Sequence, residues 1–352
     1  MIVVMKSGTP QGVIEAVVDH LHGWSLATQI IIGRENTVIG LIGDTSNLAD
    51  DRVQELSPFI ERVLRVKKRF KRASREFHPE MTVVSVPTAL GPILIGGDAP
   101  PVLMAGPCSV ENESMIIETA RRIRAAGARV LRGGAYKPRT SPYDFQGHGE
   151  SALGLLAAAR EATGLAIVTE VMDTSDLEMV AEVADIVQIG ARNMQNYALL
   201  KKAGQQPRPV LLKRAFSATI DEWLLAAEYI LAAGNPNVIL CERGIRTFDN
   251  QYTRNTLDLV AVAVLRTLTH LPVIVDPSHG TGVSQFVEAT AKAALAIGAD
   301  GLMIEVHPEP GRALSDGPQC LTPDQFDAVV DNLAPIAEVV GRPFVRSRAA
   351  VR

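Results

Sequence analysis

Cysteine is scarce in this chain, which has three in 352 residues: Cys108, Cys241 and Cys320. Three thiols cannot form the disulfide framework of a small secreted domain, and their scarcity is typical of a reducing compartment, so we expect a cytoplasmic protein. No hydrophobic run reaches the roughly 18 residues that a membrane-spanning helix needs. Residues 1–8 lack a charged segment followed by an apolar one, so we expect no signal peptide.

An excess of charge of one sign is also missing. The 35 basic and 39 acidic residues leave a net charge of −4 at pH 7, which argues against a general nucleic-acid binder. Residues 62–75 are densely basic. Because no aromatic stacking platform accompanies them, we interpret this stretch as a solvated linker between domains rather than as a patch for nucleic acid or an acidic partner.

Hydrophobic residues are plentiful, at 47% of a chain whose length is typical of two domains. Residues 1–75 predict a small α/β unit. Its elements are expected in the order strand, helix, strand, strand, helix, strand, over residues 2–5, 9–21, 29–32, 37–42, 50–60 and 60–66. This βαββαβ order is that of the ferredoxin-like domain, which often binds small ligands or partners but assigns no function by itself.

The rest of the chain predicts a hairpin and then a barrel. Residues 76–100 hold two β-rich runs, 81–86 and 92–95, that we interpret as a linker and a hairpin that precedes or plugs the next domain. Across residues 101–342, eight short apolar runs alternate with amphipathic helical stretches, which predicts a (β/α)8 TIM barrel of the usual size of about 250 residues. An open doubly wound sheet is disfavoured, since no G-x-G-x-x-G follows the first strand. Residues 343–352 form a tail.

Cations gather after the predicted strands, where a (β/α)8 barrel carries its active site. Residues 131–142 contain a glycine pair, which allows a ligand to approach the backbone closely. Prolines in the same stretch fix the turn that carries three of the cations. Guanidinium and ammonium groups are the usual partners of phosphate, so we expect two phosphorylated substrates, or a phosphate and a carboxylate. Salt bridges to Glu170, Glu242 and Asp276 are the alternative for one or two of the cations, Arg214 above all. The cations are Arg132, Lys137, Arg139, Arg192, Lys213, Arg214 and Arg243.

A second set of residues at the same ends predicts a metal site. Cys108, His279, Glu305 and Asp316 offer a thiol, an imidazole and two carboxylates, which suit a divalent transition metal with one position left for water or substrate. Taken singly, a lone cysteine is more typical of a small buried hydrophobic residue and His279 of a turn. Their joint occurrence at the ends of one barrel favours the metal site. His307 is a further candidate ligand or acid–base group.

At these residues the chain resembles the metal-dependent type I 3-deoxy-D-arabino-heptulosonate 7-phosphate (DAHP) synthases that carry an N-terminal ferredoxin-like regulatory domain. The likeness extends over essentially the whole chain. Five motifs carry it: Ala-Gly-Pro-Cys-Ser (105–109), Arg-Gly-Gly-Ala-Tyr-Lys-Pro-Arg-Thr (132–140), Gly-Ala-Arg (190–192), Cys-Glu-Arg-Gly (241–244) and Asp-Pro-Ser-His (276–279). Several are shared with the sister enzyme 3-deoxy-octulosonate 8-phosphate synthase, which usually has Lys-Ala-Asn-Arg-Ser-Ser where this chain has Lys-Pro-Arg-Thr (137–140).

The resemblance implies that the chain condenses phosphoenolpyruvate with erythrose 4-phosphate in the first step of the shikimate pathway. It implies a divalent metal ion (Mn, Fe, Co, Zn and Cd are not distinguished) on Cys108, His279, Glu305 and Asp316. It implies that Arg192, Lys213 and Arg243 bind phosphoenolpyruvate with Arg132 and Lys137 close by, and that Lys137, Arg139 and Thr140 hold erythrose 4-phosphate. It also implies a homotetramer, and an N-terminal domain that binds Tyr or Phe as a feedback inhibitor.

The mechanism expected from these residues is an aldol-type condensation. The metal acts as a Lewis acid on the aldehyde oxygen, Lys137 protonates the developing alkoxide, and Glu170 helps to place the water that adds at C2. The rival functions are the octulosonate synthase, a class II metal-dependent aldolase that would not consume phosphoenolpyruvate, and a non-catalytic metabolite sensor. An intact set of ligands and cations argues against the sensor, which needs no reactive metal position.

Overall fold

The computed structural model describes residues 1–33, 36–43, 45, 47–65, 69–137 and 141–345. Most of the predicted tail, the end of the predicted strand 60–66 and two lysines of the basic stretch lie outside these ranges. The chain forms two compact units, one of Met1–Glu80 with Leu268–His270 and the other of Met81–Thr267 with Leu271–Arg352. Within the described residues, no helix is long and apolar enough to cross a membrane.

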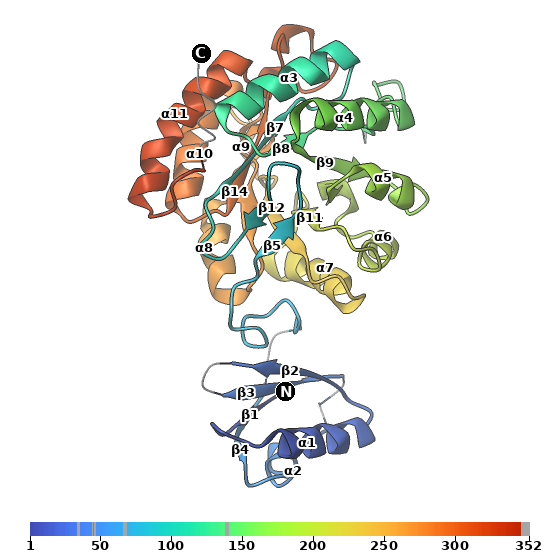
Figure 1. Cartoon of the computed structure of the whole chain (residues 1–352), viewed down its shortest axis with the longest axis vertical. Coiled ribbons are helices and arrows are strands. Elements are labelled where there is room, and N and C mark those ends of the chain that lie inside the picture. The colour runs from blue at the N-terminus through green and yellow to red at the C-terminus, as the bar shows by residue number, and fades with distance from the viewer. Residues whose placement is uncertain (34–35, 44, 46, 66–68, 138–140, 346–352) are drawn as a thin grey trace. The chain divides into compact units, whose positions relative to one another are not determined.

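The first unit has the predicted βαββαβ order, which is thereby confirmed. Its antiparallel sheet has the strand order β2-β3-β1-β4, and α1 and α2 lie together on one side of it (Figure 1). The buried side chains of Val3 and Ile39 pack against Val17 and Leu21 of α1, because apolar residues three or four positions apart share one face of a helix. The elements are β1 (Ile2–Met5), α1 (Gln11–Gly23), β2 (Ala27–Ile32), β3 (Thr37–Ile42), α2 (Asp50–Gln54) and β4 (Ile60–Leu64).

Helix α2 is shorter than the predicted 50–60 and ends at Gln54. Pro58 explains the difference, because proline has no backbone N–H to donate to the carbonyl of residue 54, and the residue before a proline avoids helical geometry. The chain therefore leaves the helix and enters β4 at Ile60.

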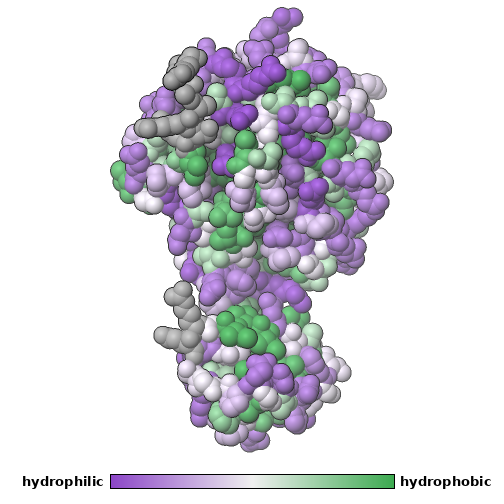
Figure 2. Space-filling view, viewed as in Figure 1, coloured by the Kyte–Doolittle hydropathy of each residue, from purple (hydrophilic) through white to green (hydrophobic). Residues whose placement is uncertain are grey.

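Strand β2 lies at one edge of this sheet and exposes apolar side chains. Ile30 and Ile32 are 41% and 73% exposed. Figure 2 shows apolar residues gathered on one part of this unit, among mainly polar surroundings. An edge strand with exposed apolar side chains favours association with another chain.

The second unit is a closed barrel of eight parallel strands, as predicted, and helices surround it (Figure 1). Its strands are β7 (Val102–Gly106), β8 (Val130–Arg132), β9 (Ala166–Val171), β10 (Ile186–Ile189), β11 (Val210–Lys213), β12 (Val238–Glu242), β13 (Val273–Val275) and β14 (Gly301–Glu305). Its helices are α3 (Glu113–Ala126), α4 (Glu150–Thr163), α5 (Leu177–Val183), α6 (Tyr197–Ala203), α7 (Ile220–Ala232), α8 (Leu259–Leu268), α9 (Pro277–Thr281), α10 (Val287–Ala296) and α11 (Pro323–Val339). Short 3-10 helices include η1 (Ala191–Asn193), η2 (Ser284–Phe286), η3 (Pro310–Arg312) and η4 (Gly317–Gln319).

The predicted hairpin plugs one end of the barrel. It consists of β5 (Val84–Val86) and β6 (Ile93–Ile95), which pair in antiparallel fashion. Their buried side chains form one cluster with the first residues of several barrel strands, among them Val102, Val130 and Ala166. The N-terminal end of the barrel is thus filled by apolar side chains, which leaves the C-terminal end for a polar site.

Candidate active site

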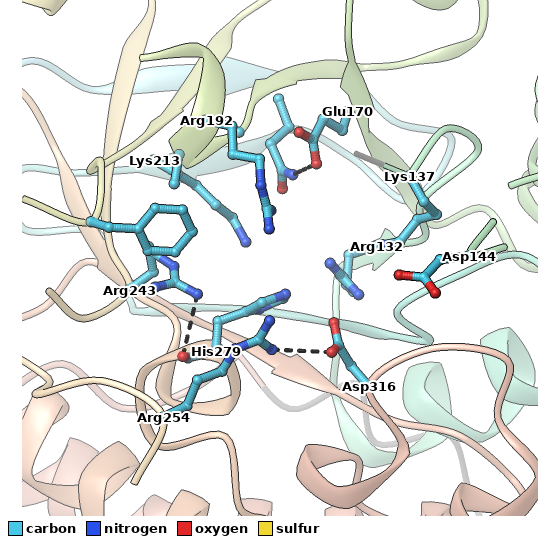
Figure 3. Close-up of a pocket in the computed structure, with 14 residues that line it drawn as sticks. Arg132, Lys137, Asp144, Glu170, Arg192, Lys213, Arg243, Arg254, His279 and Asp316 are labelled. Carbon is cyan, nitrogen blue, oxygen red and sulfur yellow. Dashed lines mark hydrogen bonds and ion pairs between the residues drawn. The ribbon is translucent and has the colours of Figure 1, made fainter. Parts of the chain in front are cut away.

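A pocket of about 240 Å³ opens at the C-terminal ends of the barrel strands (Figure 3). Most of the predicted site residues line it: Arg132, Lys137, Glu170, Arg192, Lys213, Arg243, His279 and Asp316. Cys108 and Glu305 contact two of these side chains. Arg139 and Thr140, predicted in the same loop as Lys137, lie outside the described residues. Segments spread over about two hundred positions therefore meet in one place.

The four predicted metal ligands form one compact group. The ligand atoms of Cys108, His279, Glu305 and Asp316 all lie within 4.8 Å of one another. Cys108 Sγ lies 3.2 Å from Asp316 Oδ2, and His279 Nε2 lies 3.4 Å from Glu305 Oε1. A thiol, an imidazole and two carboxylates at such distances form a donor set suited to a divalent transition metal.

The imidazole of His279 is oriented by Asp276. Asp276 Oδ1 accepts a hydrogen bond from the backbone N–H of His279 at 2.9 Å, and Oδ2 lies 2.7 Å from His279 Nδ1. Nε2 therefore faces the other three ligands, an arrangement in which a carboxylate fixes the tautomer of a metal-binding histidine. Burial lowers the pKa of His279, which favours the neutral imidazole that a metal requires.

The two carboxylates and the thiol differ in protonation. Burial would raise the pKa of Glu305, but the neighbouring His279 and Arg132 lower it. Burial would likewise raise the pKa of Asp316, and His279 and Arg254 lower it. Burial and the Glu305 charge instead raise the pKa of Cys108 to about 11, so the thiol keeps its proton at neutral pH unless a cation replaces it.

Arg132 joins the four-residue group to the pocket. Its side chain is buried, and Nη1 donates to Glu305 Oε1 at 2.6 Å and to the Pro107 carbonyl at 2.8 Å. Its Nε is buried without a hydrogen-bond partner among the described residues. Because an unsatisfied buried donor costs free energy, this N–H is suited to an acceptor brought by a ligand.

Besides Arg132, which pairs with Glu305, two more of the predicted cations form buried ion pairs. Lys213 Nζ lies 2.6 Å from Asp276 Oδ2, and both side chains are at most 5% exposed. Arg214 pairs with Glu242 at 3.0 Å and with Asp258 at 2.9 Å, and it does not line the pocket. The alternative of a structural ion pair therefore holds for Arg214.

Three other predicted cations of the described chain have no ion-pair partner. Among the described residues, no carboxylate forms an ion pair with Arg192, Arg243 or Lys137. Arg243, which is 3% exposed, donates only to the carbonyls of Gly244 and His279, each at 3.3 Å, and burial lowers its pKa. Figure 3 shows these side chains around the pocket. Uncompensated guanidinium groups in a recess form a site for anions.

Glu170, the last predicted catalytic residue, lies in the pocket wall and is 9% exposed. Its Oε2 accepts a hydrogen bond from Gln188 Nε2 at 3.2 Å. A Cβ atom at Gly190 would lie 1.9 Å from Glu170 Oε1, so the carboxylate needs a glycine at this position. Glu170 is thereby held as a hydrogen-bond acceptor at the surface of the pocket.

The sequence analysis did not identify four side chains that line the pocket: Asp144, Gln188, Phe216 and Arg254. Gln188 carried a signal, because it is a polar residue inside an apolar strand. Arg254 carried none. It lies in the long loop after β12 and donates to Asp316 Oδ1 at 3.0 Å and to Gln319 Oε1 at 3.2 Å.

His307 does not join the predicted ligands. Within the described residues, the single group of potential metal ligands does not include it. Its Nδ1 accepts a hydrogen bond from the backbone N–H of Glu309 at 3.0 Å, and its Nε2 lies 3.4 Å from Glu111 Oε1. The hypothesis that His307 is a ligand or acid–base group of this site is therefore not supported by its position in a separate recess.

Comparison with known proteins finds a matching family model for each of the two units. Residues 75–338 match the model of the DAHP synthetase I family, and residues 1–68 match that of the DAHP synthase ferredoxin-like domain. Over 341 residues the chain is 50% identical to a phospho-2-dehydro-3-deoxyheptonate aldolase of Thermotoga maritima, covering 97% of this chain and 99% of that protein. It is 35% identical over 266 residues to a 2-dehydro-3-deoxyphosphooctonate aldolase of Syntrophotalea carbinolica, covering 70% of this chain and 95% of that protein.

A solved structure has the same architecture. The crystal structure of the Thermotoga maritima phospho-2-dehydro-3-deoxyheptonate aldolase (DAHP synthase) aligns with a TM-score of 0.76 at 49% identity. The alignment covers 97% of this chain and 98% of that one.

Proposed function

Because the chain belongs to the DAHP synthetase I family, we propose that it condenses phosphoenolpyruvate with erythrose 4-phosphate and water to give DAHP and inorganic phosphate, the first step of the shikimate pathway. The observation that carries the proposal is that unpaired cations and the Cys-His-Glu-Asp group share one pocket. Two phosphorylated substrates need the cations, and activation of an aldehyde needs the other group.

The cations divide between the two substrates. Arg192 and Arg243 are assigned to phosphoenolpyruvate because no carboxylate of the described chain pairs with them. The Nε of Arg132, which has no hydrogen-bond partner there, is assigned to an oxygen of the same substrate. Lys213 adds a positive charge that Asp276 holds in place. Erythrose 4-phosphate is assigned to the loop of Lys137, Arg139 and Thr140. The fixed cations bring two anions together that would otherwise repel each other.

The donor set fits a divalent metal ion, which Cys108, His279, Glu305 and Asp316 would hold. The ion would supply Lewis acidity toward the aldehyde oxygen. The fit rests on the compact group and on the Asp276–His279 hydrogen bond, which leaves Nε2 free for coordination. Such a mixed set accepts Mn, Fe, Co, Zn or Cd.

The remaining chemistry is carried by the side chains of this chain. C3 of phosphoenolpyruvate forms a bond to the aldehyde carbon, and Lys137 donates a proton to the oxygen that becomes a hydroxyl. This role for Lys137 is supported by the position of its Nζ, which donates to the carbonyl of Cys108, a member of the four-residue group, at 2.8 Å. The C2=C3 π electrons form this bond, so positive charge develops at C2, and water oriented by Glu170 adds there and releases one proton to solvent. The hemiketal phosphate so formed loses inorganic phosphate as its C2–O bond breaks.

Replacing Gly190 by alanine is expected to lower kcat by about tenfold or more, because the new methyl group would push the Glu170 carboxylate out of place. The measurement is the steady-state rate of phosphate release at saturating substrates. A Gly154→Ala variant is the matched control, since a Cβ there meets no atom within 4 Å and Gly154 lies inside helix α4. Equal rates for the two variants would remove Glu170 from the mechanism.

A phosphate-release assay with two aldoses tests the reaction. The chain is expected to release phosphate from phosphoenolpyruvate with erythrose 4-phosphate at least about 100-fold faster than with arabinose 5-phosphate, and a chelator is expected to abolish the release. The opposite preference would favour the octulosonate synthase, such as the Syntrophotalea carbinolica relative that is 35% identical over 70% of this chain. Phosphate release that needs no phosphoenolpyruvate would overturn both assignments.

Regulation and assembly are part of the proposal. The first unit, which matches a DAHP synthase ferredoxin-like domain, is assigned to binding Tyr or Phe as an effector, and the assembly is taken to be a homotetramer. The proposed division is 1–75, 76–100, 101–342 and 343–352. Inhibition by each amino acid and the mass in solution by light scattering test these assignments.

A further inference from the structure

One aromatic ring lies among three arginines at the mouth of the pocket. Phe216 follows β11, Arg192 follows the neighbouring strand β10, and Arg243 and Arg246 follow β12 on the other side. The guanidinium carbons lie 5.4 Å (Arg192), 4.8 Å (Arg243) and 4.9 Å (Arg246) from the centroid of the Phe216 ring. All three distances are within the range of about 6 Å in which a cation interacts with the face of a ring.

These arginines have no acidic partner that would hold them together. In the described part of the chain, no carboxylate forms an ion pair with any of the three, although three guanidinium groups around one ring repel one another. Elsewhere in this barrel the structure uses carboxylates for buried cations, as for Lys213 and Arg214. Around Phe216 an aromatic ring occupies the position that a carboxylate has at Lys213 and Arg214.

The choice of a ring has a chemical consequence. A carboxylate would hold the guanidinium groups but would also cancel their charge and compete with an incoming phosphate. The negative face of an aromatic ring attracts cations through its quadrupole and has no net charge. The ring thus stabilises the arrangement of the arginines and leaves their positive charge for the substrate.

We propose that Phe216 is a positioning residue that holds Arg192 and Arg243 ready for the anionic groups of phosphoenolpyruvate. The proposal deepens the assigned function and rests on it for the identity of the substrate. Phe216 acts through the arginines, so it governs binding of the anion rather than the bond-forming steps. Its backbone carbonyl also accepts a hydrogen bond from the Arg246 N–H at 2.7 Å, and side-chain substitutions leave this link in place.

The test compares side chains of similar size with and without a ring. Phe216→Leu is expected to raise KM for phosphoenolpyruvate about tenfold and to change kcat less than threefold, since ground-state and transition-state binding of the anion weaken alike. The Kd of inorganic phosphate, measured by calorimetry on the full chain, is expected to rise by the same factor. Phe216→Tyr keeps the ring face and is expected to restore both constants to within about threefold of the wild type.

A matched control removes a ring–cation contact elsewhere. The Nζ of Lys201 on helix α6 lies 5.8 Å from the ring centroid of Tyr229 on helix α7. Tyr229→Leu is expected to leave both constants unchanged. Wild-type constants in Phe216→Leu, or equal losses in the Leu and Tyr variants at equal thermal midpoints, would overturn the proposal. If the wild type does not use phosphoenolpyruvate, the assigned function fails, and the phosphate Kd values still decide the role of Phe216.

Discussion

Lys137→Met is expected to lower kcat for DAHP formation by about 1000-fold, because a general acid typically contributes about 100- to 10,000-fold. Methionine keeps an unbranched side chain of similar length and loses the ammonium group. The fold should persist, because the Cys108 carbonyl that Lys137 contacts also accepts a hydrogen bond from the Gly134 N–H at 3.0 Å. The rate is measured at saturating substrates and metal, and the thermal midpoint is recorded beside it.

The control for Lys137→Met is another lysine lost from the same barrel. Lys292→Met removes a surface ion pair with Glu288 on α10 and is expected to keep the wild-type rate. A rate for Lys137→Met within tenfold of the wild type would move the acid role to another group. A normal kcat with a raised KM for erythrose 4-phosphate would instead leave Lys137 as a phosphate contact alone.

The barrel was predictable because its strands are short apolar runs of regular spacing, and a parallel strand buried on both faces tolerates few polar residues. The same rule located Cys108, Glu305 and the Asp-Pro-Ser-His turn of residues 276–279, since each lies at the C-terminal end of a strand or within two residues after it. The length of α2 was not predicted, because a helical pattern and Pro58 competed over the same residues.

The pairing of charges was the part that the sequence could not supply. Lys213 is the last residue of β11 and Arg243 directly follows β12, yet Lys213 lies 2.6 Å from Asp276, whereas among the described residues Arg243 contacts backbone carbonyls alone. Which acid each cation reaches depends on side-chain directions across neighbouring strands, which no spacing encodes. Arg254 is the clearest example of a contact that the sequence does not predict, because it lies in the middle of a long loop and still contacts Asp316.

The backbone conformation of Asp316 could not be predicted from the sequence either. Its φ of 51° lies in the left-handed region, which costs about 1–3 kcal/mol for a residue with a side chain. Contacts of the two preceding residues hold it there: Ser315 shares a 2.5 Å hydrogen bond with Ser109, and the Leu314 N–H donates to Glu111 Oε1 at 2.8 Å. The loop that follows β14 is thus tied to the loop that follows β7 before any ion binds.

Cys108→Ser is expected to lower the affinity for a divalent metal ion about 100-fold and to reduce turnover in parallel at limiting metal, because the thiolate is the softest donor of the group. With Co²⁺, the wild type should show a thiolate-to-cobalt charge-transfer band in the near ultraviolet, and the variant should lack it. This readout does not depend on turnover, so it tests the ligand even if the assigned reaction is wrong.

A second thiol near the group makes the test specific. Cys320 is buried, and its Sγ lies 3.9 Å from Glu305 Oε2, although it is outside the compact four-residue group. Cys320→Ala should therefore keep the charge-transfer band that Cys108→Ser loses. A band that survives in Cys108→Ser and vanishes in Cys320→Ala would assign the ion to the other thiol, and a band in neither variant nor wild type would exclude thiolate coordination. The distances decide between the two sulfurs, because only Cys108 Sγ lies within 4.8 Å of the imidazole and both carboxylates of the group.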